Sequence, residues 1–193
     1  PRGHFIQGGL LGRDCSQGKD LERRMTPGMV TYEEGLRTLP AASDPEERIK
    51  ILDAEGIDVS ILYPTLGLSW EPECDDPKLA AAYARVYNDW MIDEWCAGAG
   101  RGRLIPLTLI PLWDPVAAVA EVHRCAGKGS FAIAFSENPY HLGLPSVHDK
   151  DRFWDPFFRA CEETDSVVCM HIGSSSKMPS TSPDAPFAVS SAL

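Results

Sequence analysis

At residues 131–136 the sequence reads Phe-Ala-Ile-Ala-Phe-Ser, and at residues 167–172 it reads Val-Val-Cys-Met-His-Ile. Both stretches are short, apolar and rich in β-branched or aromatic residues, which favours β-strands. Because strand side chains alternate between two faces, the small residues of the first stretch share one face and its large residues share the other. In the second stretch Val167, Cys169 and His171 share a face. A small or polar face opposite a bulky one favours a barrel, with a lumen inside and helices outside, whereas the alternative, an open doubly wound sheet, is usually apolar on both faces.

The rest of the chain alternates helical and strand patterns. Asp-Pro occurs at residues 44–45, 76–77, 114–115 and 155–156. Asp is a favoured N-cap and proline suits the first helical position, so each pair predicts the start of a helix. The first three helical patterns end at Gly56, Gly98 and Gly127, and apolar runs at 57–63, 106–110, 131–135 and 167–172 predict four strands. This alternation predicts a parallel sheet with right-handed crossovers, as in a (β/α)₈ barrel.

Residues 77–91 show the clearest helical period. Their large apolar side chains fall on one face, as in an amphipathic helix: Leu79, Tyr83, Val86, Tyr87, Trp90 and Met91. In the following strand, Pro106 is expected at the first position, because proline has no N–H to give to a central ladder.

The number of strands sets the domain organisation. A (β/α)₈ barrel needs about 250 residues, and four strands within residues 57–172 supply half of its sheet. We therefore expect a single partial domain and an internal fragment of a longer protein. It comprises an irregular segment at 1–43, α/β units at 44–172 and a loop or tail at 173–193.

Composition excludes several classes of function. The chain has 18 Lys and Arg against 28 Asp and Glu, a net charge of −10, which disfavours nucleic acid as a partner. No apolar run reaches the roughly 18 residues of a membrane helix, so no membrane partner is expected. Six cysteines without a Cys-x-x-Cys pair favour buried thiols in a reducing cytoplasm.

The long strand-to-helix connections at 64–75 and 136–154 are expected to build the functional site. In parallel α/β folds such loops gather at the C-terminal ends of the strands. The candidate substrate-binding residues at these ends and loops are Tyr63, Trp113, Glu137, Asn138 and His141. Ordinary loop polarity is the alternative interpretation of the last three.

His171 is the strongest candidate for a metal ligand. It ends the fourth strand, where a barrel places catalytic and metal-binding groups at its mouth. The alternative is a core histidine bonded to a backbone carbonyl. Zinc requires three or four ligands, and the chain has no His-x-His and no His-Glu-x-x-His motif. The sequence identifies no catalytic acid or base.

From about Met25 to Ser176 the chain resembles the amidohydrolase-related family, in the branch of metal-dependent hydrolases and aminocarboxymuconate-semialdehyde-type decarboxylases. The matching stretches are residues 52–59 running into 63–64, 87–90, 102–104 with prolines at 106 and 111, then 114–115 and 171–173. The resemblance implies a (β/α)₈ barrel with a divalent metal, usually zinc, and makes His171 a metal ligand. The family's first-strand metal pair, later His and late Asp have no match in this chain.

The resemblance implies a metal-dependent hydrolase or non-oxidative decarboxylase acting on a small carboxylated, amide or ester substrate. Such a metal ion lowers the pKa of bound water to about 7 or polarises a substrate oxygen. A non-catalytic α/β binding module, or an inactive fragment without a complete metal site, is the alternative. With uncovered edge strands, residues 1–193 alone are expected to bind metal poorly and to form homo-oligomers or join the missing half of the barrel.

Overall fold

The computed structural model describes residues 40–64, 76–171, 174 and 180–187. Residues 1–39 of the expected irregular segment, residues 65–75 of the first long connection and two of the six cysteines lie outside the described residues. By its internal contacts the chain forms two compact units, Pro1–Ser60 with Trp95–Leu104, and Ile61–Glu94 with Ile105–Leu193. Among the described residues, no helix has the length and apolar character needed to cross a membrane.

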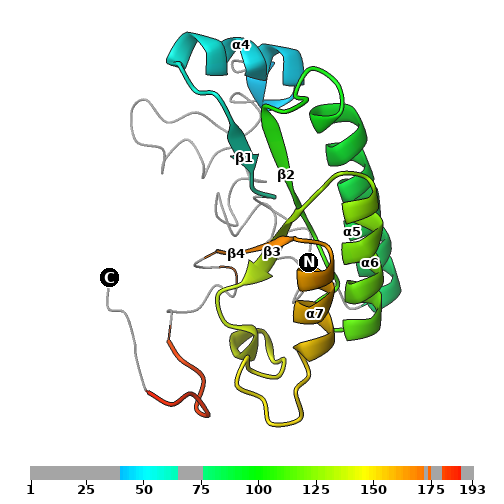
Figure 1. Cartoon of the computed structure of the whole chain (residues 1–193), viewed down its shortest axis with the longest axis vertical. Coiled ribbons are helices and arrows are strands. Elements are labelled where there is room, and N and C mark those ends of the chain that lie inside the picture. The colour runs from blue at the N-terminus through cyan, green and yellow to red at the C-terminus, as the bar shows by residue number, and fades with distance from the viewer. Residues whose placement is uncertain (1–39, 65–75, 172–173, 175–179, 188–193) are drawn as a thin grey trace, which may run out of the picture. The chain divides into compact units, whose positions relative to one another are not determined.

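The elements alternate as the sequence predicts (Figure 1). In chain order they are η2 (Pro40–Ala42), α4 (Pro45–Glu55), β1 (Ser60–Leu62), α5 (Pro77–Trp90), the π-helical turn η4 (Met91–Cys96), β2 (Leu104–Thr108), α6 (Pro115–Gly127), β3 (Ala132–Ser136), η5 (Pro139–Leu142), α7 (Asp155–Glu163) and β4 (Val167–His171).

The four strands form one sheet in the order β1-β2-β3-β4. β2 pairs with β3, and β3 with β4, in parallel, which confirms the predicted strand direction for both pairs. The expected position of Pro106 at the start of its strand is wrong, because β2 begins two residues earlier at Leu104. The recorded pairing with β3 starts at Leu107, so the missing N–H of Pro106 does not interrupt that ladder.

In the first unit, Arg103 connects the end of α4 to the residue before β2. Its guanidinium donates to the Asp53 carboxylate at 2.8 Å and to the Ile57 carbonyl at 2.9 Å. Helix α4 ends at Gly56, whose φ of 69° lies in the left-handed region that glycine adopts without strain. This confirms the predicted stop of the first helix.

Three of the four Asp-Pro pairs cap helices as expected, and the fourth does not. Asp44, Asp76 and Asp114 each accept two backbone N–H bonds at the starts of α4, α5 and α6. Asp155 is instead the first residue of α7, and the N-cap position belongs to Trp154. Trp154 is already helical, and its buried indole donates to a loop carbonyl at 2.8 Å, so packing moves the start of the helix one residue earlier.

The second helix also departs from the sequence pattern. It does not run unbroken to Gly98, because α5 gives way to the wider turn of η4 at Met91. Its buried residues are Ala80, Ala84 and Asn88, whereas Leu79 is 62% exposed. Small side chains allow the helix backbone to approach the sheet closely, so part of the predicted apolar face is left on the outside.

The two faces of β3 belong to different cores. Ile133 and Phe135 pack with α6 and α7, which lie side by side in Figure 1. Ala132 and Ala134 pack with residues of β2 and α5 and with Cys169 of β4. This division confirms the alternation of small and bulky faces that the sequence predicts.

Candidate functional site

The rings of Tyr63 and His171 lie against each other, with their centroids 5.2 Å apart and their planes tilted by 58°. Tyr63 directly follows β1, and His171 ends β4, so the contact joins the two edge strands of the sheet. Neighbouring strands are about 4.8 Å apart, so a flat four-stranded sheet would separate its edges by about 14 Å. The sheet therefore curls, and the two side chains meet on its concave side, as in part of a barrel.

A cluster of hydroxyl groups and one carboxylate follows the end of β3. Ser136 and His171 are partners in the parallel register, so they lie next to each other at the ends of β3 and β4. The Ser136 and Ser174 hydroxyl oxygens are 2.9 Å apart, and Ser174 also donates to the Glu137 carboxylate. Ser136 and Ser174 are buried, so the cluster fixes Glu137 beside the end of the β4 strand.

Asn138 and His141 are engaged by the segment that follows β4. The Asn138 amide nitrogen donates to the Ser180 carbonyl at 2.7 Å, and His141 Nε2 lies 2.9 Å from the Ser180 hydroxyl. Asn138 is 8% exposed and also caps η5. Both side chains therefore hold the 136–154 connection against residues 180–187.

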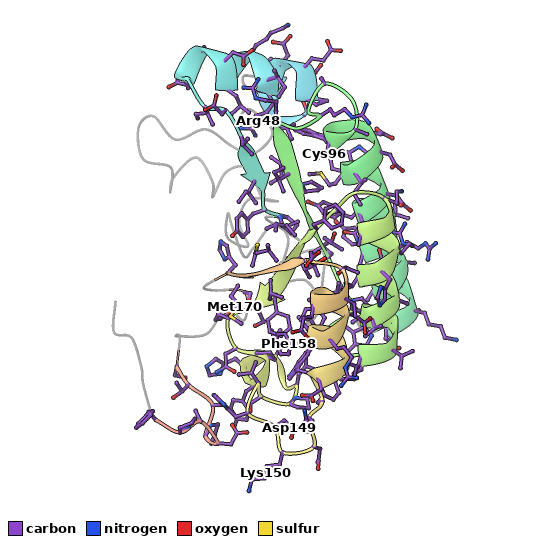
Figure 2. All side chains as sticks on the ribbon, in the orientation of Figure 1. Arg48, Cys96, Asp149, Lys150, Phe158 and Met170 are labelled. Carbon is purple, nitrogen blue, oxygen red and sulfur yellow. The ribbon has the colours of Figure 1, made fainter. Side chains whose placement is uncertain are left out.

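A second contact between these segments lies further along the connection. The Ser146 hydroxyl donates to the Asp184 carboxylate at 2.6 Å. This bond and another from Ser182 lower the pKa of Asp184. Beyond Ser146, the side chain of Lys150 points away from the strands in Figure 2.

Trp113 lies half-buried on the segment that leaves β2. Tyr63 lies against His171, as the predicted neighbourhood of His171 requires. The proximity of His171 to Trp113 stays a prediction. Ser174 and Ser180 were not among the expected site residues. Sequence alone gives no signal for them, because their partners are almost forty residues away along the chain.

The described residues do not form a complete metal centre by themselves. No group of three or more His, Cys, Asp or Glu among them is arranged to hold an ion. His171 supplies one imidazole, and a zinc site takes three or four ligands. At least part of a three- or four-ligand set would have to come from residues other than those described.

Two gamma-resorcylate decarboxylases are similar to part of this chain. A gamma-resorcylate decarboxylase from Rhizobium radiobacter is 30% identical over 135 residues, covering 65% of this chain and 38% of that protein. The same enzyme from Rhizobium sp. (strain MTP-10005) is 29% identical over 135 residues, with the same coverage of each chain. The chain therefore spans less than half the length of the curated relatives it matches.

Solved structures share the fold. An amidohydrolase from Mycobacterium avium subsp. paratuberculosis superposes with a TM-score of 0.60 at 22% identity, covering 79% of this chain and 41% of that one. A 2,6-dihydroxybenzoate decarboxylase from Rhizobium superposes with a TM-score of 0.53 at 21% identity, covering 95% and 48%. The described strands thus form part of an amidohydrolase-type (β/α)₈ barrel.

The family model described as Amidohydrolase matches residues 3–193, almost the whole chain. Proteins of this family generally use a divalent metal ion, and the matched relatives act on small molecules. The chain belongs to the amidohydrolase family.

Proposed function

We propose that the protein containing this chain is a metal-dependent, non-oxidative decarboxylase of a small aromatic carboxylate. The observation that carries the proposal is the contact of His171 with Tyr63 at the C-terminal ends of β4 and β1, the edge on which barrel enzymes build their active sites. The two curated relatives are named as decarboxylases of an aromatic acid, which favours carboxylate loss over amide or ester hydrolysis.

We propose zinc as the ion and His171 as one of its ligands. Neutral imidazole is a common zinc ligand, and His171 lies at the strand end beside a polar cluster. At least part of the remaining ligand set belongs to residues other than those described. When bound, the ion supplies a positive charge that polarises an oxygen of the substrate.

The chain's own residues divide between substrate binding and support of the loop. Tyr63 is 41% exposed, so part of its ring is accessible to a flat aromatic ligand beside His171. Trp113 and Glu137 are the other residues that we place at the substrate. Asn138 and His141 support the connection that carries Glu137, because Ser180 engages both. In the reaction the bond from ring carbon to carboxylate breaks, CO₂ leaves, and the ring carbon takes a proton.

We further propose a homo-oligomer in the cytoplasm. In residues 1–193 taken alone, the edge strands β1 and β4 carry exposed apolar side chains, with Ile61 52% and Met170 54% exposed, which a second copy or further strands of a barrel would cover. The described cysteines are all free, and burial raises the pKa of Cys125 to about 12 and of Cys161 to about 11. Unpaired thiols of this kind suit a reducing compartment.

The test uses the full-length protein that contains this chain. Metal content is measured by mass spectrometry, and CO₂ release is followed with 2,6-dihydroxybenzoate and related hydroxybenzoates. We expect about one metal ion per subunit and decarboxylation that a chelator abolishes and zinc restores. Turnover of esters or amides without CO₂ release would replace the proposal with hydrolysis, and a metal-free protein without either activity would overturn it.

A further inference from the structure

Asn88 pairs with the backbone of Leu109 as a neighbouring strand would. The Leu109 N–H donates to Asn88 Oδ1 at 2.8 Å, and Asn88 Nδ2 donates to the Leu109 carbonyl at 2.8 Å. A side-chain amide offers the same donor and acceptor as a peptide group, so both polar groups of Leu109 are satisfied by one residue. Asn88 is 1% exposed, which makes these bonds costly to leave unmade.

A carboxylate on α6 fixes the orientation of this amide. Asn88 Nδ2 also donates to Glu121 Oε1 at 2.7 Å. An ionised carboxylate only accepts hydrogen bonds, so the amide nitrogen must face Glu121 and the amide oxygen must face the Leu109 N–H. Burial acts to raise the pKa of Glu121, but hydrogen bonds from Arg124 and Asn88 outweigh it and lower that pKa, which keeps the acceptor ionised.

Arg124 holds the carboxylate in place from the surface side. Its Nε donates to Glu121 Oε2 at 2.8 Å and its Nη2 to Oε1 at 2.6 Å, while Nη1 donates to Asp89 Oδ1 at 2.6 Å. The hydrogen bonds therefore run from Asp89 through Arg124 and Glu121 to Asn88. Because every donor in this series has an acceptor, the amide has one preferred orientation.

Leu109 is the first residue after β2, at the C-terminal end of the strand. The segment that follows it is buried at Ile110 and Leu112 and reaches the half-buried Trp113. Leu109 lies beyond the residues of β2 that pair with β3, which are Leu107 and Thr108. Asn88 therefore supplies the backbone hydrogen bonds that a neighbouring strand would give to Leu109. The direction in which residues 110–113 leave the strand thus depends on a side chain of α5.

We propose that Asn88 is a positioning residue for the β2 end of the active site, one that sets the path of residues 109–113 and so the position of Trp113. The inference rests on the proposed function only in taking this strand end as part of the active site. The competing interpretation is that Asn88 contributes helix-to-sheet packing and nothing local.

The experiment compares variants of the full-length protein by amide hydrogen exchange, urea unfolding and steady-state kinetics. Asn88→Leu keeps the volume and removes the amide, and Ala80→Gly weakens the same helix at a buried site two turns away. We expect Asn88→Leu to raise exchange of the Leu109 amide by about tenfold or more relative to the amides of β3 and β4. Loss of the hydrogen bond lets this segment open locally, so its amide exchanges without global unfolding. Ala80→Gly should change exchange in proportion to global stability alone.

A nearly isosteric variant supplies a signature that packing does not. Asn88→Asp keeps an oxygen toward the Leu109 N–H but places its second oxygen against the Leu109 carbonyl and the Glu121 carboxylate, where Asn88 Nδ2 donates. Two acceptors then face each other, so exchange at Leu109 should rise relative to β3 and β4 although the shape of the side chain is kept. An equal rise of exchange in all strands of Asn88→Leu, or wild-type exchange at Leu109 in Asn88→Asp, would overturn the inference.

The kinetic arm separates this inference from the proposed function. Asn88→Leu should lower kcat/KM by about tenfold or more, because small displacements of a substrate-positioning segment are costly, and Ala80→Gly should not. Unchanged kcat/KM in Asn88→Leu would overturn the positioning role while leaving the decarboxylase assignment intact. A wild-type protein without decarboxylase activity would overturn the assignment, and the exchange measurements would still decide whether Asn88 orders residue 109.

Discussion

The imidazole of His171 packs against the phenol ring of Tyr63 across the concave side of the sheet, at a centroid separation of 5.2 Å. Tyr63 follows the first strand and His171 ends the fourth, so strand curvature, and no local motif, brings them together. A partner ring on one side limits the orientations that the imidazole can adopt. This arrangement suits a metal ligand, whose nitrogen must point in a fixed direction.

With the function proposed above, replacing His171 with Ala in the full-length protein should lower metal content and decarboxylation together. Loss of one ligand from a site of three or four weakens metal binding, so both should fall by about tenfold or more. The matched control is His123→Ala on α6, where the imidazole is half-exposed and lies 3.5 Å from Glu163. Metal content by mass spectrometry that is unchanged in His171→Ala would contradict the ligand assignment.

The two kinds of Asp-Pro pair should respond differently to alanine. Asp114 accepts from the backbone N–H groups of Val116 and Ala117 at 3.1 Å each, so Asp114→Ala should lower the free energy of unfolding by about 1 kcal/mol. Asp155 makes no cap bond and pairs with Arg152 at the surface. Asp155→Ala should therefore lower the free energy of unfolding by only a few tenths of about 1 kcal/mol. Urea unfolding measures both, and equal losses would mean that Asp155 has a capping role.

Phe135 should be the most sensitive position of the helix-side core. It is 1% exposed, stacks on Phe157 at 5.2 Å and meets the edge of Trp154 at 5.1 Å. Phe135→Ala should lower the free energy of unfolding by about 3–5 kcal/mol through lost burial and an unfilled cavity. Phe158→Ala, at a site 36% exposed on α7, should cost less than half as much in the same urea titration.

The alternation within residues 131–136 was enough to predict the two faces of β3. Phe135 packs on the helices and Ser136 lies beside His171, as side-chain parity requires. The period of two is a property of any strand, so parity survives whatever the neighbouring elements do. Proline and Asp likewise predicted three helix starts, because capping acts within a single turn of helix.

Features set by tertiary contact could not be predicted. Trp154 replaces Asp155 at the N-cap because its indole is buried and donates to the Pro145 carbonyl in the loop that precedes α7. Asn88 is a polar residue in a helical pattern, and only the folded structure shows that it pairs with Leu109. Ser174 belongs to the polar cluster through partners that no sequence period connects to it.

The ionic cluster between α5 and α6 should make the protein less stable in acid. Hydrogen bonds from Lys128 and Arg124 lower the pKa of Asp89 in the folded state. A carboxylate whose folded pKa lies below its unfolded value of about 3.9 adds stability that is complete above that value and is lost as the pH falls further through the folded pKa. Because Asp89 and its partners Arg124 and Lys128 are partly exposed, these ion pairs should add less than about 1 kcal/mol to the free energy of unfolding.

Asp89→Asn removes this titration and keeps the shape of the side chain. We expect urea unfolding to show the variant less stable than the wild type at pH 6, with the difference shrinking below about pH 4 as the wild-type carboxylate becomes protonated. Added salt should reduce the difference at pH 6, because partly exposed ion pairs are screened. A difference that stays constant from pH 6 to pH 3 would show that Asp89 acts through neutral hydrogen bonds and that its charge is irrelevant to stability.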